Sequence, residues 1–293
     1  MQQRVRLWIV GSRPKTLPAA VVPVAVGYAL VVARHDGSLA NPLNAVLALV
    51  VSIALQVGVN FANDYSDGVK GTDSKRVGPL RLGGSGAMPA PAVKRAAYLS
   101  FLVAAGAGFA IAATTSWWLI AVGVVSIVAA WTYTGGPKPY GYLGFGELFV
   151  FVFFGVVATI GTTYAVSQSI RPIDLIASCV VGFLAVALLI VNNLRDIPTD
   201  SVSGKRTLAV RLGDVGTRVL YALVMLAALV GVIMVASVHS WAGMAAVGFL
   251  LAIEPLRRIA RRAVGTELIP VLGRTARVQL IVGLLFAFGL LAS

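Results

Sequence analysis

Long apolar runs separated by short polar links make up almost the whole chain. We distinguish nine: 17–33, 43–64, 94–114, 116–133, 146–166, 171–193, 215–236, 240–256 and 274–292. A helix that crosses a bilayer needs about 20 mostly apolar residues. Some runs are joined by only a few residues, as at Thr114 to Ser116, which predicts antiparallel hairpins. The pattern predicts an all-α polytopic membrane protein, with nine transmembrane helices in one bundle and residues 1–293 as a single domain.

Composition supports the membrane interpretation. The chain is 58% hydrophobic and 12% charged, and its mean hydropathy is +0.88. Soluble domains are usually about 25% charged, and the apolar runs leave no room for one here. The basic segment before residue 16 leads into a run long enough to stay in the membrane, so we expect no cleaved signal peptide. Cys179 is the one cysteine, which excludes an internal disulfide and a cysteine-built metal site.

The basic residues are distributed unevenly between the two ends of the predicted helices. The formal net charge is +13, but the cations stand between apolar runs instead of on one wetted face, which argues against a nucleic-acid partner. Of the 24 Lys and Arg, only Arg34 and Arg171 fall outside the N-terminal segment and the predicted inner loops, which leaves 22 on one side. Positive charge is retained in the cytoplasm. We therefore predict an N-in, C-out topology in a bacterial inner (plasma) membrane.

The inner loops after the second and sixth predicted helices carry most of the acids, and a polar motif opens each of them. The first is Asn60-Phe-Ala-Asn63-Asp64-Tyr-Ser-Asp67, and the second is Asn192-Asn193-Leu-Arg195-Asp196-Ile-Pro-Thr-Asp200. Each begins at the cytoplasmic end of a predicted helix, so we expect two motif loops, at about 60–93 and 192–214. Residues three or four apart share a helix face, so each motif directs a column of oxygen atoms one way. A symmetric bundle would bring the two columns together.

These acids predict a metal site. A carboxylate at the membrane edge is costly and is a functional hypothesis by default, and the negative end of the helix dipole adds to that cost. A bound divalent cation would offset both penalties. Oxygen-only ligands select a hard ion, and Mg²⁺ is typically held by few carboxylates and by substrate phosphates, with Mn²⁺ as a possible substitute. The predicted ligands are Asp64, Asp67, Asp196 and Asp200, while Asp73 is open between ligand and loop residue.

Basic and amide side chains beside the acids suit a diphosphate that bridges the metals. The basic residues are Lys70, Arg81, Arg195, Lys205 and Arg206, and the amides are Asn60, Asn63 and Asn193.

Further motifs connect the chain to a known family. They are Arg13-Pro-Lys-Thr-Leu-Pro18, Gly78-Pro-Leu-Arg81-Leu with Ser85-Gly86, Tyr133-Thr-Gly-Gly-Pro-Lys-Pro-Tyr-Gly141 followed by Gly144-Phe-Gly-Glu147, and Gly204-Lys-Arg-Thr-Leu-Ala-Val-Arg-Leu-Gly213. With the two aspartate motifs, these segments resemble the UbiA superfamily of intramembrane aromatic prenyltransferases, and most closely its 1,4-dihydroxy-2-naphthoate polyprenyltransferases. One position departs from the superfamily pattern, because Gly71 stands where a further Asp is usual and Asp73 comes two residues later.

The resemblance implies a reaction and a set of partners. A polyprenyl chain would pass from its diphosphate to 1,4-dihydroxy-2-naphthoate, with loss of diphosphate and carbon dioxide, to give a demethylmenaquinone for menaquinone synthesis. The lipid bilayer holds the insoluble tail, and no obligate protein partner is evident. The predicted catalytic residues are Asp64, Asp67, Asp196, Asp200 and Lys205. The predicted substrate-binding residues are Asn60, Asn63, Lys70, Arg81, Ser85, Tyr133, Tyr140, Asn193, Arg195 and Arg206.

Three alternatives differ in substrate or class. A related prenyltransferase could use 4-hydroxybenzoate, homogentisate or a chlorophyll precursor as its acceptor. A CDP-alcohol phosphotransferase shares the Asp64-Tyr-Ser-Asp67-Gly68 fragment, but the rest of its signature does not follow. A cation transporter would place its acids near the middle of the membrane on broken helices, whereas these acids lie at one membrane face.

Overall fold

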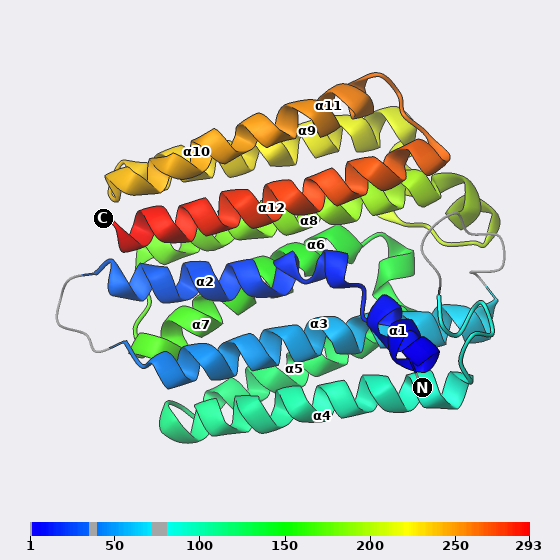
Figure 1. Ribbon diagram of the computed structural model, residues 1–293, viewed down its shortest axis with the longest axis horizontal. Coiled ribbons are helices and arrows are strands. Elements are labelled where there is room, and N and C mark those ends of the chain that lie inside the picture. Colours follow the sequence, from blue (N-terminus) through cyan, green and yellow to red (C-terminus); the bar gives the residue numbers. More distant parts are fainter. Residues whose placement is uncertain (1, 35–39, 72–80) are drawn as a thin grey trace.

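The computed structural model describes residues 2–34, 40–71 and 81–293, which form helices and turns without a strand (Figure 1). The α-helices are α1 (Gln2–Gly11), α2 (Pro18–Val32), α3 (Pro42–Lys70), α4 (Ala90–Thr114), α5 (Trp118–Thr132), α6 (Gly146–Val150), α7 (Ala158–Ser167), α8 (Pro172–Val202), α9 (Leu208–Ala236), α10 (Ala245–Gly248), α11 (Ile253–Ala260) and α12 (Leu268–Leu291). Short 3-10 segments are η1 (Pro14–Thr16), η2 (Tyr140–Leu143), η4 (Ser240–Met244), η5 (Phe249–Ala252) and η6 (Gly265–Glu267), and η3 (Phe151–Val157) is a π-helix that joins α6 to α7.

The all-α expectation is confirmed for the described residues. Six helical segments in them are long and apolar enough to cross a membrane, or seven if the bent pair of 3–16 and 18–32 is one span. Two predicted spans fall short of that test: 116–133 forms the 15-residue α5, and 240–256 is divided among η4, α10, η5 and α11. The chain is therefore a multi-pass membrane protein, and the count of nine spans stays a prediction.

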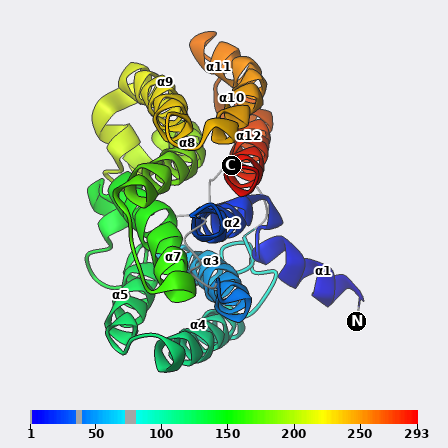
Figure 2. The same cartoon turned by 90° about the vertical axis from the view of Figure 1, so that its left-hand side faces the viewer.

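The helices run side by side along one axis, so that the N- and C-termini lie at opposite ends of the bundle (Figure 1). Helix α3 packs along α4, α8 along α9, and α12 against α2 and α8. Viewed along the bundle, α1 projects away from one side (Figure 2). The C-terminal ends of α3 and α8 lie at the same end of the bundle as the N-terminus, so both acidic motifs share that end.

Small residues let helices approach closely around the largest core. A Cβ on Gly155, within η3, would collide with the backbone of Gly182 on α8. The backbones of these two helices therefore touch there without side chains between them. Such contacts are usual between membrane helices, where packing replaces the hydrophobic effect. The core beside this crossing is built from α2, α8, α9 and α12, and Tyr221 and Phe286 are fully buried in it.

The two helices that carry the acidic motifs, α3 and α8, are longer than the apolar runs that predicted them. Helix α3 continues six residues past 64 to Lys70 and ends at Gly71, whose left-handed conformation (φ 69°) closes the helix. Helix α8 continues past 193 to Val202, through Pro198. Asp64, Asp67, Asp196 and Asp200 are thus helical residues, and the predicted motif loops began too early. The polar residues continue the helices because their side chains face protein partners and a cavity instead of lipid.

The start of the next predicted span coincides with a break in α9. Gly213 has φ 69° and ψ −177°, which interrupts the helix between 208–212 and the long segment that follows. The predicted start at 215 therefore marks the long segment of α9.

Candidate active site

One cavity of about 640 Å³ runs from the acidic end of the bundle toward the opposite end. At the acidic end it is lined by Asp67, Asp196 and Asp200 from α3 and α8. Farther along, its walls are apolar and include Val51, Ile111, Leu119 and Ala165. The cavity therefore joins a charged head to a long apolar body.

Asp67 is the most highly connected acid in the site. Arg81 Nη1 donates to its Oδ2 over 3.1 Å, and Lys205 Nζ donates to its Oδ1 over 3.2 Å. The hydroxyl of Tyr142 donates to the same Oδ1. The Lys205 contact links α3 to the segment after α8 across 138 residues of sequence, which brings the two motifs into one site.

Asp64 lies behind this site. Its side chain is fully buried, does not line the cavity, and accepts from Arg13, from Arg81 over 3.3 Å and from the Leu82 backbone N–H over 3.1 Å. Two glycines permit the arrangement. A Cβ on Gly83 would lie 2.7 Å from the Asp64 carbonyl oxygen, and one on Gly68 would lie 2.9 Å from the backbone of 83–84. The glycines let the segment with Arg81 lie directly on α3.

The second motif forms its own network on α8. Arg195 donates to both carboxylate oxygens of Asp196, over 2.7 and 2.8 Å, and to the Asn192 side chain over 2.9 Å. A paired guanidinium of this kind fixes a carboxylate in orientation as well as in charge. Asp200 follows one turn later and also lines the cavity.

The oxygen atoms in the cavity suit a hard cation that also binds a substrate. No three of the His, Cys, Asp and Glu side chains in the described ranges gather closely enough to hold an ion by themselves. Mg²⁺ does not need such a cage, since it keeps waters and takes one or two carboxylates plus phosphate oxygens. Asp67 on one side, and Asp196 with Asp200 on the other, fit that mode of binding.

Most of the predicted substrate-binding residues line the cavity, and a few do not. Those on its wall are Asn60, Asn63, Arg81, Tyr133, Tyr140, Asn193 and Arg195, and the predicted catalytic residue Lys205 also lines the cavity. Lys70 is off the wall and donates to the carbonyls of Thr134 and Gly136, over 2.8 and 3.1 Å. Ser85 and Arg206 are exposed to solvent and lie outside the cavity. Asp73 lies outside the described residues.

The predicted set lacked two basic residues and a tyrosine that line the charged end of the cavity. Arg13 and Lys15 come from the break between α1 and α2, and Tyr142 comes from η2. The ring of Tyr142 also lies under two ammonium groups, with Lys205 Nζ 4.6 Å and Lys70 Nζ 4.9 Å from its centroid. The sequence held a signal for all of them, because Arg13 and Lys15 belong to the family motif Arg13–Pro18 and Tyr142 directly follows the motif Tyr133–Gly141.

Aromatic side chains line the cavity beside the second motif. The Tyr133 and Tyr140 ring centroids are 5.4 Å apart at 67°, and Tyr140 stacks on Phe149 at 3.9 Å. Burial raises the pKa of the Tyr140 hydroxyl above its usual value. Because an ordinary tyrosine hydroxyl ionises only at about pH 10, both rings are neutral phenols at physiological pH.

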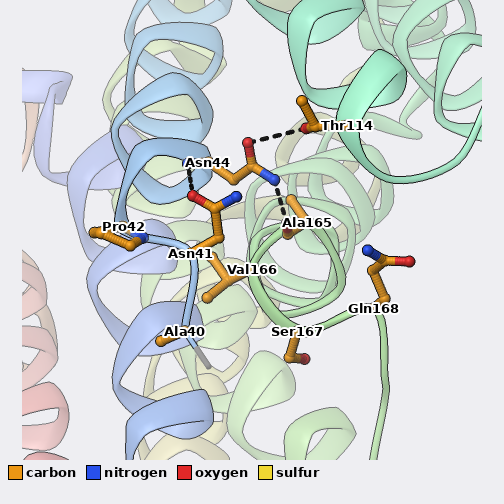
Figure 3. A pocket seen from close by; sticks show the side chains of 9 residues that line it. All are labelled: Ala40, Asn41, Pro42, Asn44, Thr114, Ala165, Val166, Ser167 and Gln168. Atoms are coloured by element: carbon orange, nitrogen blue, oxygen red, sulfur yellow. Dashed lines mark hydrogen bonds between the residues drawn. The ribbon is translucent and has the colours of Figure 1, made fainter. Parts of the chain in front are cut away.

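A second cavity of about 510 Å³ lies at the opposite end of the bundle (Figure 3). Asn44 is central to it: its amide donates to the Ala165 carbonyl over 2.7 Å and accepts from the Thr114 hydroxyl over 3.2 Å. These bonds tie α3, α4 and α7 together. No acidic or basic side chain of the described residues lines this cavity, so it offers no candidate chemistry.

Known proteins resemble this chain in sequence and in fold over almost its whole length. The chain is 46% identical over 276 residues to a 1,4-dihydroxy-2-naphthoate octaprenyltransferase of Mycobacterium tuberculosis, covering 94% of this chain and 93% of that protein. It is 37% identical to the protein of the same name from Escherichia coli, covering 99% and 96%. Among solved structures, a UbiA homolog from Archaeoglobus fulgidus bound to GPP and Mg²⁺ has the same fold, with a TM-score of 0.66, 14% identity, and coverage of 98% of this chain and 99% of that one.

The family assignment covers most of the chain. The family model described as the UbiA prenyltransferase family matches residues 20–267, which include both aspartate motifs and the aromatic wall between them. The chain belongs to the UbiA prenyltransferase family.

Proposed function

We propose that the protein transfers a polyprenyl chain from its diphosphate to 1,4-dihydroxy-2-naphthoate, releasing diphosphate and carbon dioxide and forming a demethylmenaquinone. The observation that carries the proposal is a single cavity with acids and cations at one end and an apolar body behind them. That division matches a substrate with a charged head and an insoluble tail. The names of the M. tuberculosis and E. coli relatives support the naphthoate as the acceptor.

The charged end binds the diphosphate. Five basic side chains of the described residues line it: Arg13, Lys15, Arg81, Arg195 and Lys205. Arg195 and Lys205 are nearly buried, which strengthens their interaction with phosphate oxygens relative to water. Asp67, Asp196 and Asp200 hold Mg²⁺, and the ion when bound stabilises the charge of the leaving diphosphate. Mn²⁺ replaces Mg²⁺ with the same ligands.

The polyprenyl tail occupies the apolar body of the cavity, and the naphthoate ring lies near Tyr133 and Tyr140. The neutral rings of Tyr133 and Tyr140 present electron-rich faces to positive charge on the allylic carbon. The preorganised cations at the head stabilise the opposite charge on the leaving group. The protein thereby separates the two charges that appear when the allylic C–O bond breaks.

The proposed topology has nine spans, with the N-terminus and the active site on the cytoplasmic side of a bacterial plasma membrane. Two observations support it. The termini lie at opposite ends of the bundle, as an odd number of spans requires (Figure 1). The acidic end is also the end with the basic loops, and positive charge is retained in the cytoplasm.

Reconstitution in liposomes tests the function. The protein is incubated with octaprenyl diphosphate and carboxyl-labelled 1,4-dihydroxy-2-naphthoate, in parallel with 4-hydroxybenzoate and homogentisate, and products are identified by mass spectrometry. The proposal predicts demethylmenaquinone and labelled carbon dioxide from the naphthoate, activity that EDTA abolishes, and recovery with Mg²⁺ or Mn²⁺. Faster transfer to 4-hydroxybenzoate or homogentisate, or full activity after exhaustive chelation, would contradict it.

A further inference from the structure

Glu147 is a buried carboxylate that the proposed chemistry does not yet use. It stands in the first turn of α6 and is 6% exposed. Its Oε1 accepts a hydrogen bond from Asn193 Nδ2 over 2.9 Å, while no described residue donates to Oε2. Within the described ranges it forms no ion pair. A buried carboxylate with so few partners is costly, and such a cost calls for a specific role.

The contact with Glu147 fixes the orientation of the Asn193 amide. A carboxylate only accepts hydrogen bonds, so Asn193 must present its nitrogen to Glu147. Its carbonyl oxygen then lies on the other side of the amide group. Asn193 lines the cavity and Glu147 does not. The atom that Asn193 can offer to a ligand is therefore Oδ1, which either accepts from a hydrogen-bond donor or coordinates a cation.

The surroundings of Asn193 suit a flat aromatic molecule. Tyr133, Tyr140 and Phe149 line the same cavity, and the stacking of Tyr140 on Phe149 gives it an aromatic wall. Asn193 precedes Asp196 by three residues of α8, so it lies about 4.5 Å deeper along the helix axis at 1.5 Å per residue. It is thus deeper in the cavity than the acids that would hold the diphosphate.

We propose that these residues form the subsite of the aromatic acceptor, in which Asn193 Oδ1 accepts a hydrogen bond from a ring hydroxyl. Glu147 is a positioning residue, because it acts by holding the amide. Phosphate oxygens only accept at neutral pH, so Oδ1 does not suit the diphosphate, whereas a dihydroxylated ring supplies the missing donor. The inference rests on the proposed function and specifies where its second substrate lies.

Steady-state kinetics of Glu147→Gln in liposomes tests the subsite. The glutamine amide can donate to Asn193, which lets the Asn193 amide turn and present its nitrogen to the cavity. Loss of a hydrogen bond with an unpaired group left behind corresponds to roughly 10-fold or more. We expect the KM for the acceptor to rise about 10-fold, while the KM for the prenyl diphosphate and the Mg²⁺ requirement change by less than about twofold.

The double variant Glu147→Gln with Asn193→Asp is the rescue. The carboxylate introduced at position 193 accepts from the amide introduced at position 147 and again turns an oxygen toward the cavity, so the acceptor KM should return most of the way. Asn193→Leu keeps the size but has no Oδ1, and should raise the acceptor KM as Glu147→Gln does. Circular dichroism verifies that each variant is folded, and the double variant and Asn193→Leu still test the subsite if Glu147→Gln alone is unstable.

The outcomes separate the subsite from the proposed function. A wild-type protein that prenylates no naphthoate contradicts the proposed function, whatever the variants do. If the wild type forms demethylmenaquinone but Glu147→Gln leaves the acceptor KM unchanged, the subsite alone is wrong. A change in the prenyl diphosphate KM or the Mg²⁺ requirement, instead of the acceptor KM, would also overturn the subsite, because Oδ1 would then face the diphosphate site.

Discussion

Lys205 Nζ lies 3.2 Å from Asp67 Oδ1, and this contact joins two motifs that are far apart in the sequence. Arg81 approaches the other oxygen of Asp67, so that one carboxylate is held between cations from two different segments. Burial of all three groups makes these interactions stronger than they would be in water. The head of the cavity is therefore a preorganised set of charges, fixed before a substrate enters.

Lys205 and Arg206 are adjacent cations that the structure separates sharply. Lys205 is nearly buried in the cavity wall, whereas Arg206 is exposed outside it. Lys205→Gln should lower kcat/KM by at least about 10²-fold, as losses of charge stabilisation in a dry site commonly do. Arg206→Gln should change it by less than about threefold, since an exposed charge is screened by solvent. Liposome assays of both variants test this, and equal losses would contradict the placement of the two residues.

Gly83 should be required for its size. An alanine Cβ there would lie 2.7 Å from the Asp64 carbonyl oxygen, and it would push the segment with Arg81 and Leu82 off α3. Gly83→Ala should therefore lower both the midpoint of thermal unfolding and kcat/KM, the latter by about 10-fold or more, through strain at a close backbone contact. Gly106→Ala is the matched control, because its Cβ would meet nothing within 4 Å. Normal activity in Gly83→Ala would show that the close contact does not position Arg81.

The topology can be tested with single cysteines, since Cys179 is the one native thiol. In a Cys179→Ala background, Ser203→Cys and Ser240→Cys place thiols after α8 and after α9, at opposite ends of the bundle. A membrane-impermeant maleimide added to intact cells should label position 240 and spare position 203 until the membrane is opened. The reverse pattern would invert the orientation.

Most predicted ranges coincide with helices, although the apolar run 240–256 is divided among four short segments, and the predicted ends are less accurate where the helices become polar. The four-residue spacing of Asp196 and Asp200 correctly indicated a shared face, but the helices extend to Lys70 and Val202 because the polar side chains pair within the protein. An apolar run marks the part of a helix that contacts lipid. The length of a helix whose end packs against polar protein groups is therefore underestimated from its apolar run.

The missed parts of the site depend on tertiary contacts. Arg13 has a left-handed backbone (φ 52°) at the break between α1 and α2, and that bend turns it toward Asp64. Tyr142 reaches Asp67 across 75 residues. The sequence motifs mark both segments, but nothing local in either segment indicates which acid its side chain contacts. Asp64, conversely, looked like a ligand by its spacing, yet the fold surrounds it with Arg13, Arg81 and a backbone donor, away from the cavity wall.

The central claim is that both motifs bind one diphosphate through Mg²⁺, and binding measured on the two motifs separately tests it most directly. The affinity of the protein for geranyl diphosphate is measured by calorimetry with and without Mg²⁺, for the wild type, Asp67→Asn, Asp196→Asn and the exposed control Glu267→Gln. Each aspartate variant removes one charge beside the ion without changing side-chain size. We predict that the wild type binds about one diphosphate in a Mg²⁺-dependent manner, that each aspartate variant loses at least about 10-fold in affinity, and that Glu267→Gln matches the wild type. Wild-type affinity and Mg²⁺ dependence in a folded Asp196→Asn protein would contradict a site shared by the two motifs.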